Sequence, residues 1–122
     1  MQPHTRALIA AAAHAVISGR KVAGIYDYTA SEHLRIAAQC RDNRVQCADG
    51  ERSVMFGGTL PELYDEGDKT FVSLAVDGAK AHGYDRASES HYVAEVTDLR
   101  IQLYDHKQES WFAYEVQIAP DS

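Results

Sequence analysis

The sequence predicts a mainly β fold with one N-terminal α-helix, in which a ten-stranded antiparallel up-and-down meander curls around the helix or closes against it. Two observations lead to this prediction. A unit of twenty residues recurs three times without a gap, and a fixed period of this kind indicates a repeat architecture. An alanine-rich stretch with high helix propensity precedes the repeats. The 122 residues, 45% of them hydrophobic, suit a single domain with a modest core.

The predicted helix covers residues 4–18, which are apolar almost all the way round. A helix without a polar face is typical of a buried element. Thr5 or the residues before it are placed to cap its start, and Gly19 is placed to end it. A secretory signal peptide over residues 1–24 is the alternative interpretation. His14 interrupts the apolar run and no small-residue cleavage site is evident, so we expect a structural helix and a cytoplasmic protein.

The repeats occupy residues 19–116 and predict five β-hairpins, followed by a tail at residues 117–122. Each regular copy has Tyr-Asp at positions eight and nine, a large ring at position fifteen and Val at its end. The regular copies are 57–76, 77–96 and 97–116. Residues 19–38 follow the same pattern, with Tyr26-Asp27 and His33 in the matching places. Together these copies predict short strands joined in up-and-down order.

The second copy is irregular, because Ala48 stands where the other copies have Tyr and Met55 stands where they have a ring. Two residues, Gln39-Cys40, are inserted before it, and about four are missing before Gly57. An irregular repeat within a regular array is expected to mark a bulge, a shortened strand or a bend in the sheet.

Pairing position eight with position fifteen sets the register of each hairpin. Position seven then faces sixteen, five faces eighteen and three faces twenty, all on one side of an antiparallel pair. In the last copy this side is entirely apolar or aromatic: Leu99, Ile101, Leu103, Phe112, Tyr114 and Val116. In the copy at 57–76 it holds Thr59, Pro61, Leu63, Val72, Leu74 and Val76. The opposite side is charged or polar, as in a sheet with one buried face.

Two kinds of turn are expected. Between copies, two-residue turns are expected at Gly57-Gly58, Asp77-Gly78 and Thr97-Asp98. Within copies, the aspartate at position nine faces a hydroxyl residue at position fourteen, as Asp65 faces Thr70, so we expect a hydroxyl hydrogen bond that closes the hairpin. A carboxylate cluster for a cation or for acid–base chemistry is the alternative role of these aspartates: Asp27, Asp65, Asp85 and Asp105.

The candidate binding site is a row of ring pairs on the outer face of the predicted sheet. The pairs are Tyr26 with His33, Tyr64 with Phe71, Tyr84 with His91 and Tyr104 with Trp111. Exposed rings on a rigid sheet can stack on planar ligands, sugars or amines. They can also anchor a protein interface. The alternative is a structural ladder, in which ring pairs across two strands hold the sheet in register.

No catalytic or metal signature is present, so the sequence predicts no catalytic residue, no metal site and no cofactor. The six histidines lack the spacing of a zinc motif, and His14 is expected to be buried and hydrogen-bonded. Cys40 and Cys47 are expected to lie about 20 Å apart in an extended chain, beyond the reach of a disulfide. Free thiols are typical of a reducing compartment.

The net charge of −6 argues against nucleic acid as a partner, and no apolar run is long enough to span a membrane. We therefore expect a non-catalytic binding or interaction module, with a protein or a small molecule as its partner. A homodimer through sheet edges is expected only if the barrel is open. Two alternatives are a carrier with a hydrophobic-ligand cavity and an enzyme with Asp and His at its rim. A helix inside the barrel would fill that cavity, whereas a helix across the mouth would leave it free.

Overall fold

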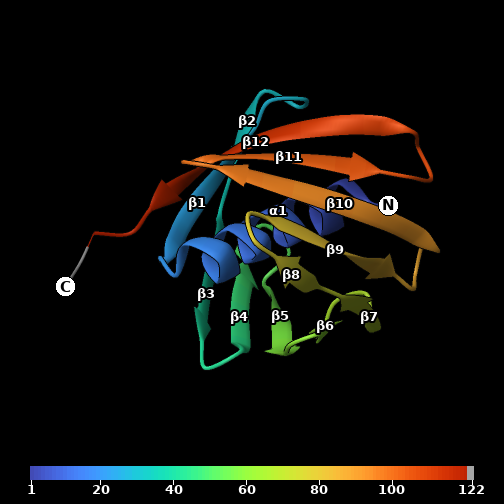
Figure 1. Ribbon diagram of the computed structural model, residues 1–122, viewed down its shortest axis with the longest axis horizontal. Coiled ribbons are helices and arrows are strands. Elements are labelled where there is room, and N and C mark those ends of the chain that lie inside the picture. The colour runs from blue at the N-terminus through green and yellow to red at the C-terminus, as the bar shows by residue number, and fades with distance from the viewer. Residues whose placement is uncertain (121–122) are drawn as a thin grey trace.

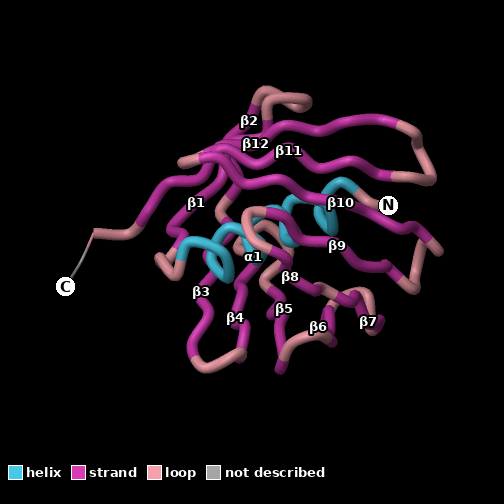
Figure 2. Tube along the Cα trace, viewed as in Figure 1, coloured by secondary structure: helices cyan, strands magenta, loops and turns pink. Residues whose placement is uncertain are grey.

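The computed structural model describes residues 1–120 and consists of one helix inside a closed ten-stranded antiparallel barrel with two additional outer strands. Figure 1 shows the helix lying along the middle of the barrel, and Figure 2 shows it enclosed by strands on several sides. In chain order the elements are α1 (Pro3–Ser18), β1 (Val22–Asp27), β2 (Glu32–Leu34), β3 (Ile36–Arg41), β4 (Arg44–Asp49), β5 (Val54–Thr59), β6 (Glu62–Asp65), β7 (Thr70–Ser73), β8 (Ala75–Asp77), β9 (Lys80–Asp85), β10 (Ser90–Thr97), β11 (Arg100–Asp105) and β12 (Ser110–Ile118).

The barrel closes because β12, the last strand, pairs with β1, the first. The wall contains all strands except β2 and β8, which are short outer strands on β1 and β9. In each case a strand predicted as one piece is divided by a single residue: Arg35 separates β2 from β3, and Leu74 separates β7 from β8. The prediction of a ten-stranded meander is confirmed. A homodimer through sheet edges was expected only if the barrel were open, and the observed barrel is closed.

The helix lies inside the barrel, and residues from Thr5 to Ala15 are buried on every side. Strands from all five hairpins contact it. Alanine side chains suit this place, because their small size lets the surrounding sheet approach the helix closely. His14 is buried as expected, with Nε2 2.6 Å from the carbonyl oxygen of Asp98. Among residues 1–120 there is no helix of the length and apolarity that a membrane span requires.

The C-terminus of α1 is as predicted, and its N-cap is one of the residues before Thr5 rather than Thr5 itself. Gly19 ends the helix with a positive φ of 71°, and its N–H donates to the carbonyl oxygen of Ala15. Thr5 does not cap the start. Gln2 is the N-cap residue without a side-chain hydrogen bond, and Pro3 follows it, where the missing N–H of proline is no loss. The predicted tail at residues 117–122 begins within β12, and its last two residues lie outside the described part of the chain.

The register within the hairpins is as predicted, with Tyr84 opposite His91 and Tyr104 opposite Trp111. The turns between regular copies fall one residue later than expected, at Gly78-Ala79 and Asp98-Leu99. The cause is backbone conformation: Gly78 and Asp98 take the first turn position with φ of 63° and 53°. A β-branched Thr97 would be strained in that conformation.

The first predicted connection was displaced further. Gly57 and Gly58 belong to β5, and the chain reverses at Leu60-Pro61 instead. A Cβ on Gly57 would lie 2.2 Å from the carbonyl oxygen of Val45, so a close approach between β4 and β5 requires glycine there. The later turns also remove two residues from the expected core, because Val76 and Leu99 are 39% and 40% exposed at the hairpin ends.

Candidate functional site

All four predicted ring pairs form on the outer surface of the barrel. The ring centroids lie 4.6 Å apart for Tyr84 and His91, and 5.1 Å apart for Tyr104 and Trp111. The other two pairs, Tyr26 with His33 and Tyr64 with Phe71, are separated by 4.7 and 4.9 Å. In every pair the tyrosine is half-buried and its partner is exposed, with Trp111 54% exposed. These distances are typical of interacting aromatic rings.

Neighbouring ring pairs are staggered along the barrel wall. Tyr104 is paired with Val93, which lies two residues beyond His91 on β10. This stagger places His106 next to His91, since the N–H of His106 donates to the carbonyl oxygen of His91 at 3.0 Å. The ring of His106 also packs edge-on against Tyr104 at 4.8 Å.

Five rings therefore follow one another across β9, β10, β11 and β12, and we call them the five-ring row: Tyr84, His91, His106, Tyr104 and Trp111. A surface hollow of about 540 Å³ borders the row, with Tyr84, His91 and His106 in its lining. His106 was missed from the sequence. The available signal was its position, directly after the Asp of its copy, where a stagger of two residues brings it opposite the ring of the preceding copy.

Five aspartates, which we call the turn aspartates, gather at the end of the barrel where α1 begins: Asp27, Asp49, Asp65, Asp85 and Asp105. Each is at most 6% exposed. The expected role in turn closure is observed, but the expected hydroxyl donor at position fourteen is not. Asp65 Oδ1 instead accepts hydrogen bonds from the backbone N–H groups of Gly67 and Asp68, at 2.8 and 2.9 Å. A carboxylate at the start of a four-residue turn satisfies the turn's own amides more directly than it reaches across the strands.

Basic side chains meet these carboxylates. Arg52 donates from Nε to Asp49 Oδ2 at 2.7 Å and from Nη2 to Asp65 Oδ2 at 2.9 Å. Burial, which raises the pKa of Asp65, is outweighed by the hydrogen bonds from Arg52 and from the turn amides, so the pKa of this carboxyl is lowered. Arg6 lies near Asp105, with Nη1 3.8 Å from Oδ2, and stacks on the ring of Phe112.

One group at this end has donor atoms close enough to hold a metal ion: His4, Asp65 and Asp68. His4 Nε2 lies 2.7 Å from Asp68 Oδ2. The guanidinium of Arg52 already contacts both aspartates, at 2.9 Å for Asp65 and 3.4 Å for Asp68. The positive charge at these two carboxylates is therefore supplied by Arg52.

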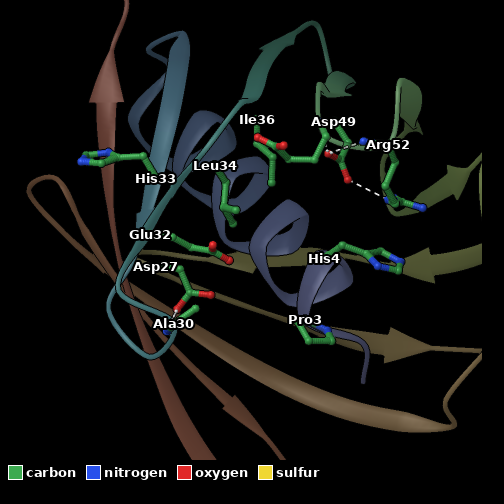
Figure 3. A pocket seen from close by; sticks show the side chains of 11 residues that line it. Pro3, His4, Asp27, Ala30, Glu32, His33, Leu34, Ile36, Asp49 and Arg52 are labelled. Carbon is green, nitrogen blue, oxygen red and sulfur yellow. Dashed lines mark hydrogen bonds and ion pairs between the residues drawn. The ribbon is translucent and has the colours of Figure 1, made fainter.

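A pocket of about 440 Å³, which we call the seam pocket, lies between the first and second hairpins beside the start of α1. Figure 3 shows its lining, which includes Pro3, Asp27, Glu32, Leu34, Ile36 and Arg52. The pocket forms where the predicted strand breaks at Arg35: β2 continues along β1, whereas β3 pairs with β4. In Figure 1, β2 leans away from the rest of the wall. The break lies just before the irregular copy of the repeat.

The two cysteines are free, but they do not lie far apart. Cys40 is in β3 and Cys47 is in β4, and the turn at Asp42-Asn43 brings these strands together. The extended distance expected from the sequence was therefore wrong. Burial raises the pKa of the Cys47 thiol far above its usual range, which keeps it protonated and unreactive.

The fold and these sites define a helix-filled antiparallel barrel of five hairpins, with interacting rings outside and, at one seam, a pocket lined by both carboxylates and apolar side chains. Comparison with known proteins finds no family model that matches the chain, and no curated protein or solved structure with a significant match. The chemistry of its surface and pockets is therefore the basis for assigning a function.

Proposed function

We propose that this protein is a non-catalytic binding module that recognises a neutral or basic partner through the five-ring row. The observation that carries this proposal is the row itself. Five rings follow one another on the outer face of the sheet, and three of them, Tyr84, His91 and His106, line a hollow of about 540 Å³, so ring faces and edges are available to a partner.

The exposure of the row supports recognition over a purely structural ladder. The core is built from the helix and the inward side of the wall, to which the outward rings contribute nothing. Trp111 leaves 54% of its surface in solvent. Exposed aromatic side chains that are held rigidly lose little entropy on binding and are frequent anchors of interfaces. The net charge of −6 favours a partner that is neutral or basic.

The test is a thermal-shift survey of the wild type against sugars, planar ligands, fatty acids and basic peptides, with Trp111→Ala and Phe71→Ala in parallel. Phe71→Ala is the matched control. It removes an exposed ring that also pairs with a tyrosine, outside the five-ring row and its hollow. We expect a ligand that raises the melting temperature of the wild type and of Phe71→Ala but not of Trp111→Ala.

A different result would favour the ladder. If no ligand shifts the wild type, and both variants melt at similarly lowered temperatures, the ring pairs stabilise the sheet and the proposal fails. The fatty acids in the survey also address the carrier alternative. That alternative has little support, because α1 occupies the barrel interior and Ala7 to Ala13 have no exposed surface.

The enzyme alternative depends on Asp and His within hydrogen-bond reach beside a pocket. His4 and Asp68 meet that condition at 2.7 Å, and His4 lines the seam pocket. A His–Asp pair alone lacks a nucleophile and an oxyanion site, so binding remains the better-supported proposal. A hydrolytic activity that is detected in the wild type and lost in a His4→Ala variant would reverse this preference.

A further inference from the structure

The turn aspartates provide an internal comparison, in which Asp27 differs from the other four. In those four, Oδ2 has a hydrogen-bond or ion-pair partner: Arg52 for Asp49 and Asp65, the Ser88 hydroxyl for Asp85, and, for Asp105, the amino group of Met1, which lies 3.2 Å away in an ion pair without a hydrogen bond. Asp27 is 6% exposed, and its Oδ1 accepts hydrogen bonds from the N–H groups of Thr29 and Ala30. Its Oδ2 has neither a hydrogen-bond partner nor an ion-pair partner among the residues that the structure describes.

The residue opposite Asp27 makes this difference larger. Glu32 is its direct partner across the hairpin. The other turn aspartates face uncharged residues: Val54, Thr70, Ser90 and Ser110. Like charges directly opposite each other destabilise an antiparallel pair. The first hairpin therefore carries a repulsion that the rest of the repeat avoids, and local conflicts of this kind are expected at functional sites.

Both carboxylates line the seam pocket, and in Figure 3 they lie next to each other on one side of it. The basic groups across the pocket are already neutralised, because Arg52 binds Asp49 and Asp65 and His4 contacts Asp68. Glu51, the remaining acid of the lining, is paired with Arg35 at 3.2 Å. The charge left without a partner in this pocket is negative.

We propose that the seam pocket binds a small organic cation, with an ammonium or guanidinium group between Asp27 Oδ2 and Glu32. Charged N–H donors form strong hydrogen bonds with carboxylates and would relieve the repulsion between them. The apolar body of the ligand would lie on Leu34 and Ile36. A volume of about 440 Å³ suits such a ligand. A bare calcium ion fits less well, because it prefers six or more oxygen ligands.

The experiment is NMR titration of the folded protein with n-hexylammonium, and with 1-hexanol as the uncharged counterpart. Expected for the wild type is saturable binding of the ammonium with shifts of the Leu34 and Ile36 amides, and no such binding of the alcohol. Glu32→Gln should weaken binding by roughly tenfold or more, since a hydrogen bond to a charged group is lost. Without ligand, the same variant should melt at a higher temperature than the wild type.

Two controls separate this site from the rest of the surface. Glu89→Gln removes an exposed acid in the fourth hairpin and should leave the affinity unchanged. Trp111→Ala should also leave it unchanged, whereas a loss of binding there would move the ammonium to the five-ring row and overturn this proposal. Equal affinity of Glu32→Gln and wild type, or no saturable binding of the ammonium up to about 10 mM, would overturn it as well. Equal binding of hexanol would overturn it too. So would saturable shifts of the Leu34 and Ile36 amides on titration with Ca²⁺ alone.

Discussion

At the scale of single residues, the turn aspartates combine two roles in one side chain. One carboxylate oxygen accepts hydrogen bonds from amides of its own turn, and the other is available to a cation or a hydroxyl, as Asp65 Oδ2 accepts from Arg52. The turns also share a conformation. In all five, the residue before the second strand has a positive φ between 52° and 55°: Ser31, Ser53, Lys69, Glu89 and Glu109. The hydrogen bonds to Asp thus hold a backbone shape that non-glycine residues rarely adopt unaided.

Asp65→Asn is predicted to lower the free energy of unfolding by about 1–3 kcal/mol at neutral pH, because the charged contact with Arg52 is lost. The pKa of Asp65 is lowered in the folded protein from 3.8. Its stabilising contribution is therefore fully present above that value and disappears as the pH falls through the lower folded pKa. Urea unfolding across a pH series should show the wild type and variant converging in acid.

Asp42→Asn is the control for this measurement. Asp42 is exposed at a hairpin end, where its positive φ of 51° suits Asn equally well. It should leave stability almost unchanged at every pH. A difference between wild type and Asp65→Asn that persists at the lowest pH would contradict the assignment to the ionised carboxylate.

At the scale of secondary-structure elements, α1 is a core helix without a solvent face. Its N-terminus points to the end of the barrel that holds the buried carboxylates, and negative charge there is favourable to the helix dipole. Basic residues in the first turn, such as Arg6, would be unfavourable on an isolated helix. Here Asp105 offsets that charge.

Leucine substitutions along α1 test burial on all sides. Successive residues of a helix point roughly 100° apart, so four neighbours sample its whole circumference. We predict that Ala10→Leu, Ala11→Leu, Ala12→Leu and Ala13→Leu each lower the free energy of unfolding by about 1–3 kcal/mol through overpacking. Chemical denaturation measures this, with the exposed Ala87→Leu as control. One well-tolerated position among the four would mean that a face of α1 is free.

At the scale of the whole molecule, closure and the central helix make the five hairpins interdependent. The helix contacts strands from every hairpin, and the pairing of β1 with β12 links the two ends of the chain. No hairpin can leave the barrel without exposing part of the helix.

We predict that the protein unfolds in a single cooperative transition. The fluorescence of Trp111, the only tryptophan, reports on β12, and far-UV circular dichroism reports on the helix and sheet together. The two signals should give coincident curves in urea, as two-state unfolding requires. An earlier fluorescence transition would show that the last hairpin separates before the barrel unfolds.

The sequence alone determined the repeat, the number of strands, the register within hairpins and the helix. These features depend on residues that are close in the chain, so that Tyr84 and His91 can be paired by counting. The same counting places Glu32 opposite Asp27, a signal that was present but not used. The turns between copies were displaced, because the position of a positive φ, as at Gly78 and Asp98, depends on side-chain strain.

The tertiary structure alone decided closure, the place of the helix inside the barrel and the stagger between hairpins. These features depend on the combined tilt and stagger of ten strands around one core, which no local sequence pattern specifies. The stagger brings His106 to His91, and the break at Arg35 opens the seam pocket beside Asp27. Both candidate sites thus arise from contacts between different repeats, whereas the sequence pattern describes each repeat separately.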